Sequence, residues 1–86
     1  MRYKKIIENA ILINDIESNT TTGDLEYPGT ALEICNKEGE DLFHFIVDGN
    51  GDIQALFFAN KYDYRIPVEL LEKIVAKAKE VVKKTG

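Results

Sequence analysis

Residues 30–59 read TALEICNKEGEDLFHFIVDGNGDIQALFFA, and this stretch decides the fold. It holds three short runs rich in Ile, Val, Leu and Phe, separated by two segments of Gly, Asn, Asp, Lys and Glu. Apolar runs broken by such turn residues are typical of consecutive β-hairpins. We therefore expect an antiparallel β-meander with strands at 30–36, 41–47 and 53–59 and turns centred on residues 38–39 and 50.

An amphipathic helix is expected after the meander. Apolar residues recur at intervals of three or four from Val68 to Val82, and charged residues fill most of the remaining positions. Pro67 suits the first turn of this helix, because a missing N–H is tolerated there. The helix is predicted to cover one face of the sheet.

The N-terminal third gives two alternatives. Residues 3–11 have the spacing of a short helix, whereas residues 11–17 also fit an edge strand. Residues 18–29, rich in Thr, Asn and Gly, are predicted to be the longest irregular segment. The expected fold class is α+β: a meander of 3–4 strands, a C-terminal amphipathic helix on one face, and a short N-terminal helix or edge strand, all in a single domain, 1–86.

Side-chain alternation gives the expected sheet two unlike faces. One face is entirely apolar, and we expect the helix to cover it: Leu32, Ile34, Phe43, Phe45, Val47, Ile53, Ala55 and Phe57. The other is half apolar and half polar: Glu33, Cys35, Leu42, His44, Ile46, Gln54, Leu56 and Phe58. Since a solvated face is normally polar, this second face needs a cover. The candidates are N-terminal residues such as Ile6, Ile7 and Leu12, a dimer mate, or a different protein.

Charge is distributed unevenly along the chain. The formal net charge is -4, but residues 15–52 hold ten acidic residues and a single base, Lys37. This segment repels nucleic acid, and the lysines of the helix alternate with glutamates instead of forming a phosphate-binding stripe. No apolar stretch approaches the length of a membrane span. We expect no nucleic-acid binding and no membrane binding.

The single cysteine, Cys35, limits which cellular compartment and which disulfide or metal sites are expected. One cysteine can form neither an intramolecular disulfide nor a cysteine-based zinc site within one chain, and a reducing, cytoplasmic setting fits best. Glu8 and Asn9 interrupt the apolar run that an export signal requires. Residues 48–52 resemble the start of a calcium loop, but Ile53 stands where that loop needs glycine. We expect no metal and no cofactor.

The expected register places His44 opposite Glu33 and diagonal to Cys35. Thiol, imidazole and carboxylate are the groups of an activated thiol nucleophile. No glycine-rich turn is available nearby for an oxyanion hole, and a buried thiol beside a hydrogen-bonded histidine explains the same residues. A small enzyme or ligand-binding domain that uses this face, or the loop at 20–24, is therefore kept as an alternative to the favoured function.

The favoured function is a protein-binding module, not an enzyme. The small size, the acidic middle and the half-apolar face are typical of an inhibitor of the immunity-protein, antitoxin or anti-defence type, which covers a basic surface of a partner enzyme. A homo-oligomeric protein without chemistry is a further alternative. Residues 60–65 add two tyrosines and an arginine, which are frequent at binding hot spots. The predicted partner-binding residues are Asp24, Glu26, Glu33, His44, Gln54, Leu56, Phe58, Tyr62, Tyr64 and Arg65.

Overall fold

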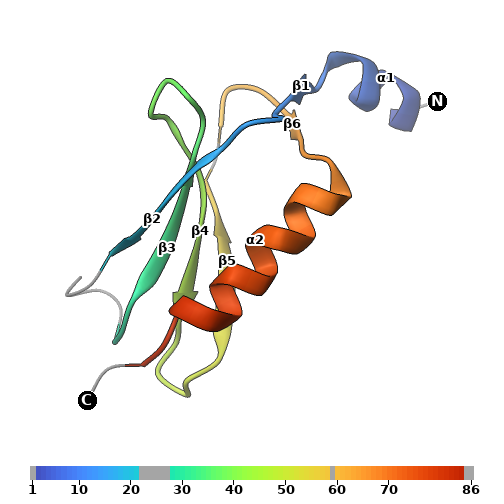
Figure 1. Ribbon diagram of the computed structural model, residues 1–86. Helices are drawn as coiled ribbons and strands as arrows, with labels where there is room; N and C mark the ends of the chain where they lie inside the picture. The colour runs from blue at the N-terminus through green and yellow to red at the C-terminus, as the bar shows by residue number, and fades with distance from the viewer. Residues whose placement is uncertain (1, 22–27, 59, 85–86) are drawn as a thin grey trace.

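A computed structural model describes residues 2–21, 28–58 and 60–84 of the chain. Strands β2 to β5 form a four-stranded antiparallel sheet in that order, and helix α2 lies across one face of it (Figure 1). The predicted α+β fold, a meander with a C-terminal helix, is confirmed. The elements in chain order are α1 (Arg2–Asn9), β1 (Ile11–Leu12), β2 (Glu17–Thr21), β3 (Ala31–Cys35), β4 (Asp41–Val47), β5 (Ile53–Phe57), β6 (Tyr64–Arg65) and α2 (Val68–Val81).

The core lies between α2 and the middle of the sheet. The helix turns Ile74 and Ala78 inward, and Val82 directly after it is also buried. They meet the side chains of the two central strands β3 and β4, among which Leu32 and Ile34 are 0% exposed. The buried residues of this cluster are Ile13, Leu32, Ile34, Leu42, Phe43, Phe45, Val47, Ile74, Ala78 and Val82.

The pairing of β4 with β5, and of β3 with β4 from Leu32 to Ile34, follows the register expected from the turns, whereas a bulge shifts the pairing of Cys35 by one residue. Glu33 pairs with His44, and His44 pairs in turn with Leu56. The turn between β4 and β5 is closed by Asp48, whose carboxylate accepts hydrogen bonds from the N–H groups of Asn50 and Asp52, both at 2.9 Å. Such side-chain acceptors favour a turn over a continued strand. The three strands of the meander are thus set by local turn chemistry and by alternation.

The N-terminal region differs from the prediction in two respects. The segment 11–17, considered as one strand, is divided: β1 pairs in parallel with β6, and β2 begins only at Glu17. The prediction of an irregular segment is wrong for residues 18–21, which belong to β2 and pair along β3. The rest of that segment up to residue 27 lies outside the described residues. Backbone pairing with the neighbouring strand here outweighs the weak strand preference of Ser and Asn.

The two ends of the sheet are closed differently. At one end, α1, β1 and β6 form a small extension beyond the sheet (Figure 1). At the other, the segment before β3 is joined to the segment after α2, because the Thr30 N–H donates to the Lys83 carbonyl at 2.9 Å and the Lys83 N–H donates to the Thr30 hydroxyl at 2.8 Å. These bonds fix where α2 ends over the sheet. In the described part of the chain, neither helix has the length and apolar character needed to cross a membrane.

Candidate protein-binding face

The candidate site is the sheet face turned away from α2, which we call the far face. Because Leu32, Ile34 and Phe45 point into the core, the residues that alternate with them on the same strands point the other way. This places five predicted binding residues on one surface, as expected. The far face comprises Glu17 and Asn19 of β2, Glu33 and Cys35 of β3, His44 and Ile46 of β4, and Gln54 and Leu56 of β5, with Phe58 just after β5.

The far face combines half-exposed apolar side chains with acids and one histidine, and its strands carry no Lys or Arg. Ile46 and Leu56 are half-buried, and Phe58 is 37% exposed with its ring edge-on to the His44 imidazole at 4.7 Å between centroids. The apolar part lies toward β5, whereas the glutamates of the face lie on β2 and β3. The charge of this surface is therefore negative on one side and near zero on the other.

The N-terminal segment does not cover the far face, so that expectation is wrong. Helix α1 extends beyond one end of the sheet (Figure 1), and Ile6 and Ile7 are 40% and 58% exposed. Leu12 is 43% exposed, because β1 pairs only with β6. The eight residues of α1 are too few to reach back over the sheet while they remain helical and β1 stays paired. Among the described elements, none packs on the far face.

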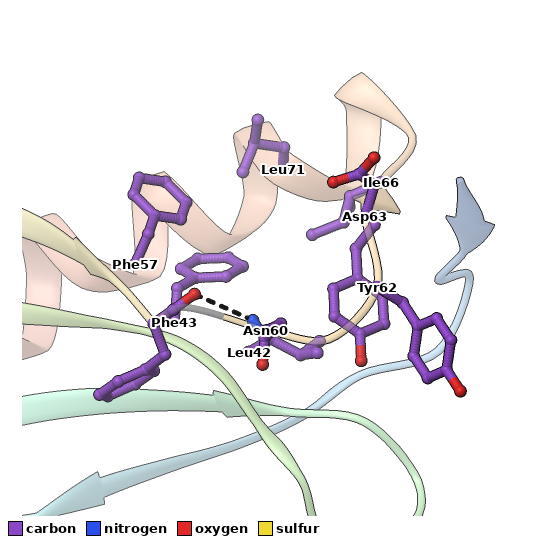
Figure 2. Close-up of a pocket in the computed structure, with 10 residues that line it drawn as sticks. Leu42, Phe43, Phe57, Asn60, Tyr62, Asp63, Ile66 and Leu71 are labelled. Carbon is purple, nitrogen blue, oxygen red and sulfur yellow. Dashed lines mark hydrogen bonds between the residues drawn. The ribbon is translucent and has the colours of Figure 1, made fainter. Parts of the chain in front are cut away.

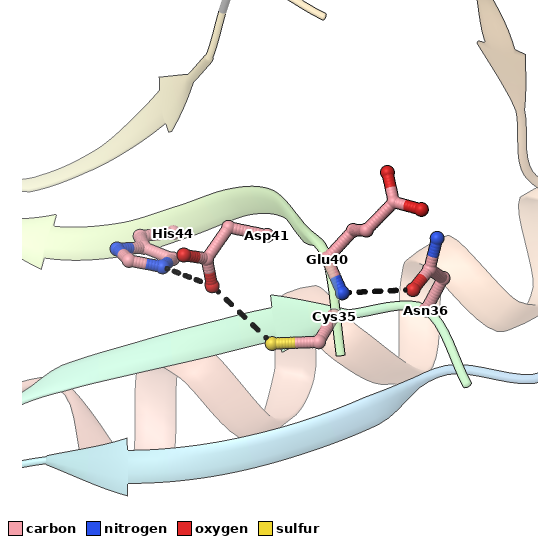
Figure 3. Close-up of polar contacts among 5 residues, drawn as sticks. All are labelled: Cys35, Asn36, Glu40, Asp41 and His44. Atoms are coloured by element: carbon pink, nitrogen blue, oxygen red, sulfur yellow. Dashed lines mark hydrogen bonds and ion pairs between the residues drawn. The ribbon is translucent and has the colours of Figure 1, made fainter. Parts of the chain in front are cut away.

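A small polar group occupies the end of the far face near the β3–β4 turn (Figure 3). The Cys35 thiol donates to Asp41 Oδ1 at 3.3 Å, and the same oxygen lies 3.3 Å from His44 Nε2. The carboxylate that links thiol and imidazole is thus that of Asp41, not the predicted Glu33. The sequence pattern missed Asp41 because a bulge in β4 pairs it directly with Cys35.

The electrostatics of this group disfavour a thiolate. The pKa of Cys35 is raised from an ordinary 9.0 to about 11, first by desolvation and then by the hydrogen bond to Asp41 and the negative charges of Asp41 and Glu33. The pKa of Asp41 is lowered, because its carboxylate accepts hydrogen bonds from Cys35 and His44. A nucleophilic cysteine requires the opposite shift. In this arrangement the Cys35 thiol stays protonated beside the ionised Asp41 carboxylate, so Cys35 is not an activated nucleophile.

The bulge also changes the position of Leu42. Since Ile34 pairs with Phe43 and Cys35 with Asp41, Leu42 has no partner on β3. Its side chain is 3% exposed and belongs to the core cluster. The prediction that Leu42 lies on the half-polar face is therefore wrong, and the extra residue of the bulge is the cause.

The adjoining turn is held by the buried side chain of Asn36. Its Oδ1 accepts from the Glu38 N–H at 3.1 Å. It also accepts from the Glu40 N–H at 2.9 Å (Figure 3). Glu38 and Glu40 are exposed at this end of the sheet. The turn thereby fixes the position of Asp41, which starts β4, and adds negative charge to the rim of the far face.

The predicted residues of the segment 60–65 lie elsewhere. Tyr64 and Arg65 form β6, and Arg65 Nε donates to the Ala10 carbonyl at 3.3 Å, so both help to hold the N-terminal region. Tyr64 is half-buried against the core, whereas Tyr62 is 53% exposed with Lys61 Nζ at 5.4 Å from its ring centre. The structure therefore does not bring this segment onto the far face. Asp24 and Glu26 lie outside the described residues.

A second surface feature is a groove of about 390 Å³ between β5, the segment 60–66 and the start of α2. Figure 2 shows Phe43, Phe57 and Leu71 of α2 among the side chains that line it. Phe57 is 70% exposed, and Ile53 and Ala55 on the same strand are also exposed. The expectation that α2 covers the whole apolar face is thus wrong for β5. The helix packs over the two central strands, so the outer strand remains open on this side.

Binding of a metal or of a known type of ligand has no support from either the geometry or the comparisons. Among the described residues, no group of His, Cys, Asp or Glu side chains is arranged to hold a metal ion. No protein-family model, no curated protein and no solved structure matches this chain. What the site can do must therefore be argued from its own residues.

Proposed function

We propose that the chain is a protein-binding module, an inhibitor of the immunity-protein, antitoxin or anti-defence type, whose far face covers a basic surface of a partner enzyme. The observation that carries the proposal is a sheet face that is half apolar, rimmed by acids and uncovered by any described element. Interfaces between proteins have this composition, with an apolar centre and a polar rim. The single cysteine supports a cytoplasmic location for this function.

The acids support a basic partner. Glu17 and Glu33 lie on the far face itself, and Glu38 and Glu40 are exposed in the turn at its end. With no Lys or Arg on the four strands, no positive side chain from them offsets this charge. Complementary charge speeds association with a basic surface and disfavours acidic partners. Enzymes that act on nucleic acids present such basic surfaces.

The apolar residues supply the part of the interface that excludes water. Leu56 and Phe58 sit side by side with the His44 ring, and none of the three is fully buried in the isolated chain. Burial of such aromatic and aliphatic groups at the centre of an interface accounts for most of the binding energy. The proposal assigns no catalytic step to Cys35, because its raised pKa keeps the thiol protonated at neutral pH.

Affinity capture with charge variants tests the proposal. The wild-type chain and two variants, Glu33→Lys on the far face and Glu80→Lys on the exposed side of α2, are immobilised and exposed to lysate at low and high salt. We expect the wild type and the α2 variant to retain the same basic protein, and Glu33→Lys to retain about tenfold less. The purified partner then allows two direct measurements, association rate against salt and loss of the partner's activity on titration with the chain.

An apolar variant completes the design. Phe58→Ala should weaken binding to the purified partner by about tenfold or more while leaving the salt dependence unchanged, because it removes packing and no charge. The proposal fails if Glu33→Lys binds the partner as well as Glu80→Lys does. It also fails if binding is indifferent to salt, or if a saturating amount of the chain leaves the partner fully active.

A further inference from the structure

Strand β5 is an unprotected edge of the sheet. It is the last strand in the order β2-β3-β4-β5, and in the part of the chain that the structure describes no strand pairs with its outer side. Its sequence, IQALF, contains no charge and no proline, whereas the opposite edge, β2, reads ESNTT. Natural sheets usually protect an exposed edge with charged residues, proline or a bulge. The absence of these devices from β5 indicates that this edge is paired in the functional protein.

The outward backbone groups of β5 can be identified from the turn. The Asp48 N–H donates to the Asp52 carbonyl at 2.9 Å, so this pair is hydrogen-bonded. Hydrogen-bonded and non-hydrogen-bonded pairs alternate along an antiparallel ladder, so Gln54 and Leu56 use their backbone groups toward β4. The residues that turn N–H and C=O toward the open edge are Ile53, Ala55 and Phe57.

The side chains of these same three residues form the exposed apolar strip beside α2. Phe57 and Leu71 of α2 both line the larger groove (Figure 2). Ile53 and Ala55 border a smaller groove of about 220 Å³ together with Lys79 of α2. An edge with free backbone groups and an apolar flank binds another extended strand.

We propose that the occupant is a second copy of this chain, paired antiparallel through β5 about a two-fold axis at Ala55. In this register Ala55 lies opposite Ala55 of the other copy, and Ile53 lies opposite Phe57. Every outward N–H and C=O of β5 then meets a partner, because outward residues face outward residues. The small alanines at the axis leave room for the Phe57 ring of each copy to cover the Ile53 side chain of the other. Both α2 helices lie on the same side of one continuous sheet.

Charge on α2 supports a second copy as the occupant. Lys79 lies at the Ile53 end of the strip, and Glu72, about two turns earlier on the same side of the helix, lies near the Phe57 end. Both side chains are exposed. An antiparallel arrangement reverses the ends of one copy relative to the other, so Lys79 of each copy faces Glu72 of the other. The strip is thus complementary to itself in backbone, in shape and in charge.

The first test measures the mass of the purified chain by sedimentation or light scattering over a range of concentrations. The wild type should shift from monomer to dimer, about twofold in mass. Ala55→Pro should weaken the dimer by at least tenfold, because it removes an outward N–H and leaves the β4–β5 bonds intact. Ala55→Lys, which places like charges at the axis, should do the same. Thr20→Lys on the β2 edge is the matched control and should dimerise normally.

Two further measurements keep the test independent of folding defects. Hydrogen exchange on the wild type should show Ala55 and Phe57 amides protected only at high concentration, whereas Gln54 and Leu56 amides are protected throughout. Lys79→Glu and Glu72→Lys should each weaken the dimer about threefold or more, and the double variant should restore it.

Three outcomes overturn the proposal. The first is a wild type that stays monomeric up to millimolar concentration, which would leave the edge to a strand from a different protein. The second is a dimer that survives both Ala55 variants. The third is concentration-dependent protection that appears in β2 and not in β5.

Discussion

The thiol of Cys35 should react slowly in the folded chain. A pKa raised from an ordinary 9.0 to about 11 leaves about a hundredfold less thiolate at pH 8 than an unperturbed cysteine has. Thiolate nucleophilicity increases with pKa, with a Brønsted coefficient of about 0.4–0.5, which recovers about tenfold of this loss. We therefore expect folded Cys35 to react about tenfold more slowly with a neutral disulfide, such as 4,4′-dithiodipyridine, than the same chain unfolded in urea.

The assay follows release of the thione between pH 7 and pH 10. The rate of the unfolded chain should be half-maximal near pH 9 and approach its plateau at pH 10, whereas the rate of the folded chain should still rise steeply at pH 10. Asp41→Asn should speed the folded reaction, because it removes the accepting carboxylate, and Glu38→Gln, an exposed acid of the turn, should leave it unchanged. A folded rate at pH 8 that equals or exceeds the unfolded rate would refute the reasoning and restore Cys35 as a candidate nucleophile.

Three further predictions concern stability and pH. Gly29→Ala should lower the free energy of unfolding by about 1–3 kcal/mol, because its added Cβ would clash with the backbone oxygen of Lys83. Gly49→Ala meets open space and should be neutral, and urea unfolding of both variants measures the difference. Leu32→Ala, at a site with 0% exposure, should cost about 2–5 kcal/mol, and an unchanged urea midpoint would contradict the described core. Hydrogen bonds to the Asp41 and Asp48 carboxylates lower both pKa values below the ordinary 3.8, so the stabilisation they give is complete above about pH 5 and is lost as the pH falls through the folded pKa values. Carboxyl NMR titrations with midpoints at or above 3.8 would be inconsistent with this.

The meander could be predicted because its signals are local. Strand β4 has the predicted bounds, since Gly39 and the Asp48 turn mark its two ends and the Phe and Val side chains alternate between them. Helix α2 begins at Val68, where the apolar spacing starts, although Pro67 precedes the helix as its N-cap residue and does not lie in the first turn. Once these turns are placed, the pairing of Glu33 with His44 follows from counting residues.

The errors arose where distant segments or an irregular register decide the structure. Strand β2 lacks an apolar alternation and is a strand only because β3 lies beside it. The parallel pairing of Ile11 with Tyr64 joins two segments that lie far apart in the sequence, and no local pattern encodes it. The bulge next to Asp41 shifts the β3–β4 register by one residue, so Leu42 lies in the core and not on the far face. A one-residue slip reverses the face of a side chain, so single bulges defeat alternation arguments.

The open side of β5 was missed for a different reason. Alternation correctly placed Phe57 on the same face as Phe43, and the two rings lie 5.3 Å apart between centroids. Alternation does not say how far a helix reaches across a sheet, and α2 is one narrow element over four strands. One helix about 10 Å wide covers two strands spaced about 4.8 Å apart, so the outer strand is left without a cover.

The two proposed surfaces are compatible and reinforce each other. Pairing through β5 extends the sheet in its own plane, so the far faces of both copies lie side by side on one surface. Leu56 and Phe58 then approach the two-fold axis, whereas Glu33 on β3 and Glu17 on β2 move to the two outer sides. The combined surface has an apolar centre and an acidic rim, which is the anatomy of a protein interface. A single chain presents only half of that pattern, with its apolar residues at an unprotected edge, so dimerisation would complete the surface that the proposed function needs.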